Sequence, residues 1–188
     1  MNQVKEYSYN LDENMLKLLG GEFGAEEVVG RFCQAVAGKK KDEIEEIAKG
    51  IFGEYGREWM RRTIQLGEEY VDRTYELLQA VAEKTNSYRF GLIPQRFLEI
   101  AYLATQEFSG LPVLECNSRC LRYKIDECLI YKTQRQLCGD EIAELMPCRY
   151  ACLNACRTLH ESLDIDAIVE MPNSMSRDGY CQFVVRKP

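Results

Sequence analysis

The sequence predicts an α+β fold in which a helical N-terminal half packs on a small antiparallel sheet with a cysteine-bearing helix. Apolar residues recur at helical spacing through residues 11–84. From residue 111 onward, short segments typical of strands alternate with polar turns. Eight of the nine cysteines lie between positions 116 and 181. We therefore expect one domain over 1–188, with a helical subdomain at 11–84 and a cysteine-rich α+β part at 86–188.

The N-terminal half is predicted to be helical because each apolar stripe would face a common core. Gly20 and Gly21 are typical of the end of a first helix. Gly67 lies inside the last long stripe and costs a helix about 1 kcal/mol relative to alanine. A break is expected at Thr85–Ser87. The predicted helices cover residues 11–19, 25–37, 42–52, about 58–84 and 94–108.

The C-terminal part is predicted to mix strands and helices. Pro147 suits the first position of a helix over 147–163, because no partner is needed there for the N–H that proline lacks. Residues 165–171 and 180–186 would form a hairpin around the polar turn at 172–179. The other predicted elements are strands at 111–116 and 127–133 and a short helix at 140–145.

Composition excludes several classes of partner and predicts a location. With 24 basic and 30 acidic residues the net charge is −6, so the basic surface that a nucleic-acid partner requires is absent. No segment approaches the roughly 20 apolar residues that span a membrane. Met1–Asn10 lacks the apolar core of a signal peptide, which predicts a cytoplasmic protein. A reducing cytosol disfavours disulfides, and an odd number of cysteines fits no complete disulfide framework.

The cysteines of the predicted 147–163 helix suggest a metal site. Cys148, Cys152 and Cys156 recur every four residues and share one helix face. Two thiols one turn apart can reach a common ion, whereas Cα atoms two turns apart lie about 12 Å from each other, which makes Cys156 a core residue. If this helix packs on the last hairpin, Glu170 and Cys181 join the first two cysteines. Thiolates with one carboxylate favour zinc over magnesium or calcium.

Three stretches carry a resemblance to a known family: Met146–Cys148, Ile168–Glu170 and Asp178–Phe183. They resemble the 4-vinyl-reductase-like domain, which is similar to the sensor domains of bacterial activators that respond to aromatic compounds. In that family a cysteine after a proline, a glutamate on a strand and two further cysteines hold zinc below a hydrophobic ligand pocket.

Carried over by position, the resemblance implies that Cys148, Glu170 and Cys181 are zinc ligands. The remaining ligand of the family falls near Asn173, where this chain has no thiol. Either Cys152 or water replaces it, or the metal has been lost. The implied function is a cytosolic small-molecule-binding domain whose zinc stabilises the fold and whose small hydrophobic ligand lies between the helical half and the sheet.

A second resemblance rests on Pro147–Cys148, Ile165–Asp166, Pro172 and Cys181–Phe183. These residues are similar to those of the L-2-amino-thiazoline-4-carboxylic acid hydrolase-like family. That resemblance implies an enzyme in which a metal-bound water attacks the C=N carbon of a heterocyclic cyclic amidine. The position without a thiol near Asn173 would supply the open coordination site.

The candidate catalytic residues are Cys148, Asp178 and His160, the only histidine. His160 lies four residues after Cys156, so the two side chains could pair and activate the thiol. The simpler interpretation places a charged imidazole at a helix C-terminus, where the helix dipole favours it. Asp178 precedes a glycine, which is typical of a turn.

Three further alternatives stay open at this point. A metal-free globular protein would use its cysteines as small core residues. A homodimer could form through the cysteine helix and exposed tyrosines. An iron–sulfur cluster would use Cys116, Cys120 and Cys138 in place of zinc.

Overall fold

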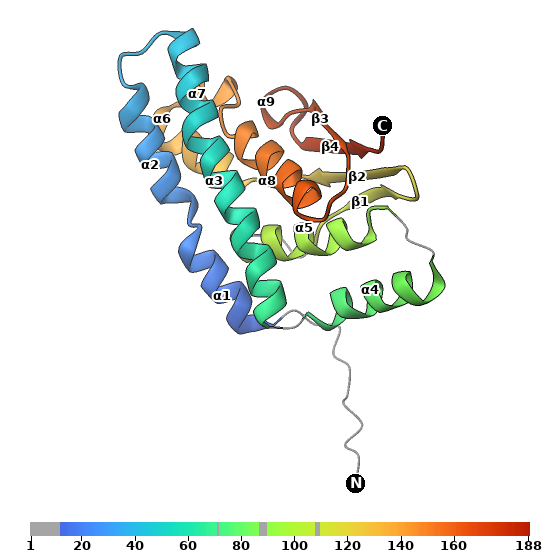
Figure 1. The fold of residues 1–188 in the computed structure, drawn as a ribbon. Coiled ribbons are helices and arrows are strands. Elements are labelled where there is room, and N and C mark those ends of the chain that lie inside the picture. Colours follow the sequence, from blue (N-terminus) through green and yellow to red (C-terminus); the bar gives the residue numbers. More distant parts are fainter. Residues whose placement is uncertain (1–11, 71, 87–89, 108–109) are drawn as a thin grey trace.

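The computed structural model describes residues 12–70, 72–86, 90–107 and 110–188 (Figure 1). Its elements confirm the predicted α+β class, with helices packed on a small antiparallel sheet. In chain order they are α1 (Glu13–Glu22), α2 (Ala25–Val36), α3 (Lys41–Glu69), α4 (Arg73–Thr85), α5 (Leu92–Thr105), β1 (Val113–Cys116), β2 (Cys120–Ile125), α6 (Leu129–Cys138), α7 (Asp140–Glu144), α8 (Arg149–Ser162), β3 (Ile168–Asn173), α9 (Met175–Asp178) and β4 (Cys181–Arg186).

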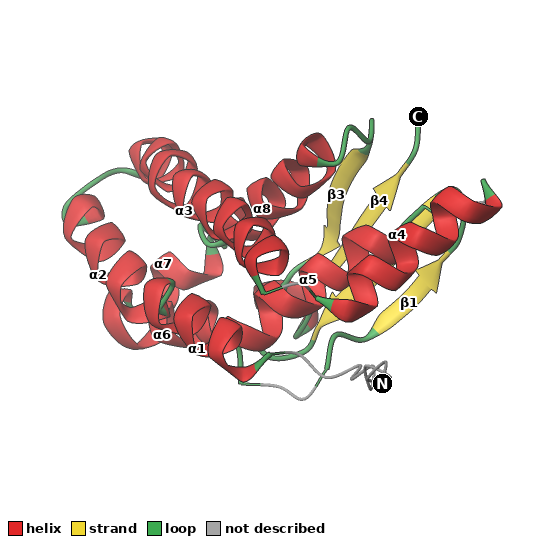
Figure 2. Ribbon diagram, turned by 60° about the horizontal axis from the view of Figure 1, so that its bottom comes forward, coloured by secondary structure: helices red, strands yellow, loops and turns green. Residues whose placement is uncertain are grey.

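The sheet has the strand order β1-β2-β4-β3, and every neighbouring pair is antiparallel. Alternate residues of each strand point to opposite faces. Leu121, Tyr123, Phe183 and Val185 are fully buried on the inner face, against which the helices pack (Figure 2). The predicted hairpin of the last two strands is confirmed, and β4 lies centrally between β2 and β3.

The helical half joins the sheet through one continuous core. α3 packs along α8, and α5 contacts both of them. The buried core includes Phe32 of α2, Trp59 of α3 and Tyr102 of α5 together with Phe183 of β4. The two parts expected from the sequence therefore share their apolar interior. Among the described residues, no helix is both long and apolar enough to cross a membrane.

Several predicted helix ends are wrong. α3 continues without a break from Lys41 to Glu69, so the expected gap near residues 53–57 is absent. The chain instead turns before Asp72, whose carboxylate caps the N-terminus of α4. α1 runs through Gly20 and Gly21 to Glu22. At Gly20 a side chain would meet the Ala104 carbonyl, so this glycine serves close helix packing rather than a helix end. The expected break begins after α4 at Asn86, whereas Ser87 and Phe108 lie outside the described residues.

The predicted strand at 127–133 is also wrong, because this segment begins α6. Ile130, Thr133 and Gln134 are buried at helical spacing, and Cys128 caps the helix by accepting a hydrogen bond from Tyr131 N. The sequence analysis also missed β2, which pairs with β4 on the side away from β3. The short helix at 140–145 is confirmed as α7. The predicted polar turn at 172–179 contains the single turn of α9.

A buried ion pair joins the start of α4 to α5. The Arg96 guanidinium donates to both carboxylate oxygens of Asp72 at 2.9–3.2 Å. The two side chains are 10% and 3% exposed, respectively. Asp72 also accepts a hydrogen bond from Tyr75 N at 2.8 Å. The Asp72 carboxylate therefore both caps α4 and compensates the charge of Arg96.

We expect Asp72→Asn to lower the free energy of unfolding by about 3 kcal/mol, because it leaves the buried Arg96 with only the more exposed Glu99, at 3.4 Å, as its charged partner. Asparagine still caps helices well, so the loss isolates the ion pair. Urea unfolding followed by circular dichroism measures it. In the exposed Arg73–Glu76 pair, Glu76→Gln should change stability by less than about 1 kcal/mol. Equal effects of the two substitutions would contradict this account.

Candidate functional site

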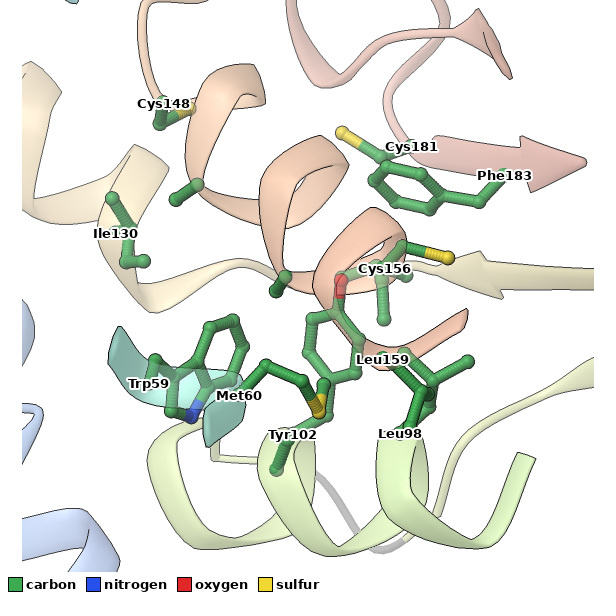
Figure 3. Close-up of a cluster of buried hydrophobic side chains, with 14 of the residues drawn as sticks. Trp59, Met60, Leu98, Tyr102, Ile130, Cys148, Cys156, Leu159, Cys181 and Phe183 are labelled. Atoms are coloured by element: carbon green, nitrogen blue, oxygen red, sulfur yellow. The ribbon is translucent and has the colours of Figure 1, made fainter. Parts of the chain in front are cut away.

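The structure brings three of the four predicted metal residues into the same interior. Cys148 is the N-cap residue of α8, Cys152 lies one turn further on, and Cys181 begins β4. Cys148 and Cys181 are 4% and 6% exposed. Figure 3 shows Cys148, Cys156 and Cys181 among the buried aromatic and aliphatic side chains around α8. The cysteine-bearing helix therefore packs on the last hairpin, which was the condition for the predicted site.

Glu170 does not join these thiols. In the register of β3 with β4 it lies opposite Val184, whereas Cys181 and Phe183 point to the other face of the sheet. Its carboxylate pairs with Arg186 at 3.3 Å, and both side chains are 54% exposed. The carboxylate is thus held on the outer face, away from the cysteines.

The predicted metal site is therefore wrong. The described part of the chain contains no group of three or more His, Cys, Asp or Glu residues that could hold a metal ion. The small-molecule-binding domain built on a zinc site is wrong, and so is the hydrolase that uses a metal-bound water. The predicted iron–sulfur set also fails, because Cys138 is bonded to Cys33. The sequence around Glu170 gave no signal of the sheet face on which its side chain would lie.

His160 is buried rather than a charged helix end. It is 2% exposed, and burial lowers the pKa of its imidazole below the ordinary value. Its Nδ1 lies 2.7 Å from the carbonyl oxygen of Cys156, and only 3.9 Å separates the same nitrogen from the Cys156 Sγ. Because burial raises the pKa of the Cys156 thiol to about 12, this pair forms no thiolate–imidazolium couple.

Asp178 has a local structural role. Its carboxylate accepts hydrogen bonds from the Arg177 Nε at 3.0 Å and from the Ser174 backbone N at 2.8 Å. The Arg177 contact, followed by the Ser174 contact, holds the pKa of the carboxyl below its ordinary value. Asp178, the last residue of α9, thus bonds back to Ser174, the N-cap residue, and closes this single turn.

The free thiols of the interior are protonated at neutral pH. Burial raises the pKa of Cys128, Cys148 and Cys152, with smaller contributions from neighbouring thiols at the last two. Burial likewise raises the pKa of Cys181 to about 12. Only the thiolate is nucleophilic, so these groups are poorly reactive in the folded protein.

Alkylation of the native protein should show this directly. A thiol with a raised pKa has less thiolate at any pH below that value, so at pH 8 iodoacetamide should label Cys156 and Cys181 about a thousandfold more slowly than in the unfolded chain. The native rate should keep rising with pH beyond pH 10. Mass spectrometry of the labelled peptides gives the rates, and a plateau near pH 9 would contradict the prediction.

One pair of cysteines stands apart from this protonated interior. Cys33 of α2 and Cys138 at the end of α6 form a disulfide with a Cα–Cα distance of 5.4 Å and a sequence separation of 105 residues. Both residues are half-buried. The other seven cysteines form no disulfide. This bond covalently ties the helical half to the cysteine-rich part.

The disulfide lines a cleft of about 420 Å³ between α2, the start of α3, and the α6–α7 segment. The cleft also carries Lys39, Lys41 and Glu141. Lys39 is engaged by Glu43 at 3.3 Å, whereas Lys41 has no ion-pair partner among the described residues. Lys39 and Lys41 line the same cleft as the disulfide, and a positive charge near a sulfur favours its thiolate form, so the cleft can support thiol–disulfide exchange.

Sequence reasoning missed this pair. Cys33 lies beside Phe32 on the apolar stripe of α2, where a small core residue is the ordinary interpretation. The odd number of cysteines excludes a complete framework but allows one bridge. No spacing rule connects two cysteines so far apart in the chain. A scan against protein-family models and searches of curated proteins and of solved structures found no match to this chain.

Proposed function

We propose that this protein is a thiol-redox protein whose reactive group is the Cys33–Cys138 pair. A single observation carries the proposal: of nine cysteines, the two that are bonded line an open cleft with a lysine that lacks a partner in the described structure, whereas burial suppresses the thiols of the interior. The sequence predicts a cytosolic protein, and in that compartment a disulfide is typical of catalytic or redox-sensing pairs.

The proposed reaction is thiol–disulfide exchange with a dithiol. A thiolate of the dithiol attacks one sulfur, forms a mixed disulfide and releases the other cysteine as a thiolate, which Lys41 favours. The second thiol of the reductant then attacks the mixed disulfide, releases the remaining cysteine of the protein and forms a cyclic disulfide within the reductant. The protein gains two electrons and two protons, and the dithiol becomes a cyclic disulfide. An oxidised dithiol reverses the sequence.

Reduction would uncouple two elements that are distant in the chain. α2 packs on both α3 and α6, and the disulfide is its covalent link to α6. Once this bond opens, only noncovalent contacts hold α2 against the cysteine-rich part. The redox state would then control how firmly the two parts are joined, which suits a sensor as well as an exchange protein.

The experiment equilibrates the folded protein at pH 7 with mixtures of reduced and oxidised dithiothreitol, and then traps thiols with N-ethylmaleimide. Mass spectrometry should show Cys33 and Cys138 labelled together along a reversible two-electron curve, in which a tenfold change in equilibrium constant corresponds to about 30 mV. Lys41→Met should slow reduction about threefold, since one nearby charge is lost. Lys84→Met, which removes an exposed lysine of α4, serves as the control.

A disulfide that opens only after the protein unfolds would contradict the proposal, and so would a pair that cannot be re-formed by oxidised dithiothreitol. The resemblance to the 4-vinyl-reductase-like and amino-thiazoline hydrolase-like families stays a prediction. In a member of either family that has lost its metal, an exchangeable disulfide would be a separate function carried by the same fold.

A further inference from the structure

The cleft that contains the disulfide is lined mainly by uncharged residues. Its volume of about 420 Å³ lies within the range of small-molecule sites, which are typically apolar with a few polar groups. The apolar residues come from the end of α2, the start of α3 and the α6–α7 segment: Val36, Ala37, Ile44, Leu137, Ile142 and Leu145. The disulfide and an apolar wall therefore share one cavity, so a reductant that reaches the bond also meets the wall.

Leu137 gives this wall a large apolar side chain that is open to solvent. It directly precedes Cys138 at the end of α6 and is 54% exposed. A single exposed leucine is ordinary on a protein surface. This one, however, lines the same cleft as the disulfide, together with the half-buried Ile142 and Leu145. Three apolar side chains thus lose contact with water when a molecule fills the cleft, which favours an apolar occupant.

The charges of the lining select for neither sign. The Lys39 Nζ is paired with Glu43 at 3.3 Å, which leaves Lys41 and Glu141 as one charge of each sign. A strongly charged reductant would be attracted by one of these two side chains and repelled by the other. The lining therefore favours an uncharged molecule.

We propose that the reductant of this cleft is a neutral dithiol carried on an apolar chain, such as a dihydrolipoyl group, an inference that rests on the proposed redox function. The chain would contact Leu137 and Ile142 while its dithiol reaches the Cys33–Cys138 bond. One thiolate attacks a sulfur of that bond, and the second thiol then closes a cyclic disulfide and releases the remaining cysteine. Two electrons and two protons pass from the dithiol to the protein. Because both thiols belong to one molecule, no second reductant has to enter the cleft.

The test compares dihydrolipoamide with dithiothreitol, since both are neutral dithiols that close a cyclic disulfide but only the first has an apolar chain. The folded, oxidised protein is mixed with each reductant at pH 7, and thiols of Cys33 and Cys138 are trapped with N-ethylmaleimide and measured by mass spectrometry. Each rate is divided by the rate of the same reductant with hydroxyethyl disulfide, which has no cleft. We expect the normalised rate of dihydrolipoamide to exceed that of dithiothreitol about tenfold, the effect of burying about two methylene groups.

Two leucine variants show whether the cleft causes this preference. Leu137→Asn should lower the ratio of the two normalised rates about fivefold, because it removes apolar surface from the cleft. Leu18→Asn, at a leucine of α1 that is 42% exposed and lies outside the cleft, should leave the ratio unchanged. The inference is overturned if the unsubstituted protein shows a ratio near one, or if the two variants behave alike. Either result leaves the redox proposal standing, whereas failure of both reductants to open the bond in the folded protein overturns both proposals.

Discussion

Replacing Cys33 and Cys138 together by serine is expected to lower the free energy of unfolding by about 3–4 kcal/mol. The disulfide closes a loop of 105 residues, and a cross-link over a loop of that size removes much of the conformational freedom of the unfolded chain. Both residues are only half-buried, so the lost packing contributes little. Urea unfolding of the oxidised protein and of the double variant gives the difference.

Reductant supplies the matched control for this prediction. Adding dithiothreitol to the native protein should reproduce the loss, because it opens the same bond. Adding it to the double variant should change nothing, since the other seven cysteines are already free thiols. If the double variant unfolds at the same urea concentration as the oxidised protein, the covalent link between α2 and α6 is not part of the folded state.

Gly56→Ala should destabilise the protein by about 3 kcal/mol, at the upper end of the range for overpacking. Gly56 lies where α3 crosses α8, and a methyl group there would overlap the carbonyl carbon and oxygen of Ala151. These are backbone atoms of a helix, which cannot rotate out of the way as a side chain would. The two helices would have to separate, and the core around Trp59 would open with them.

Gly50→Ala on the same helix is the comparison for this prediction. Gly50 is exposed, and a methyl group there would meet no atom within 4 Å. Alanine is the better helix former, so Gly50→Ala should raise stability by about 0.5–1 kcal/mol. Opposite signs for two identical substitutions in one helix would confirm the close approach of α3 and α8. A stable Gly56→Ala protein would show that the two helices lie further apart.

The spacing of apolar residues along the chain predicted most of the helices, because it indicates which face of each segment is buried. The stripe of α2 and Pro147 each contain enough information to place one element, although α8 begins at Arg149, two residues after the predicted first residue Pro147. The segment at 127–133 misled because a short apolar run fits either a strand or a helix. In the structure the Cys128 thiol caps α6, and sequence rules do not count cysteine among the common caps.

The candidate site was harder to predict because it depends on faces and on distant pairs. Cys148 and Cys181 do lie in the same buried core. Glu170 was assigned to the wrong face, since the register of β3 against β4 decides which way it points. The contact of Cys33 with Cys138 requires α2 and α6 to lie side by side, which no local pattern states.

The most direct test of this account is a count of thiols in the protein as isolated, blocked with N-ethylmaleimide at lysis and unfolded without reductant. The account predicts seven labelled cysteines per chain, with two more appearing only after reduction, and peptide mapping should identify these two as Cys33 and Cys138. Nine labelled cysteines before reduction, or a bridge between any other pair, would contradict it.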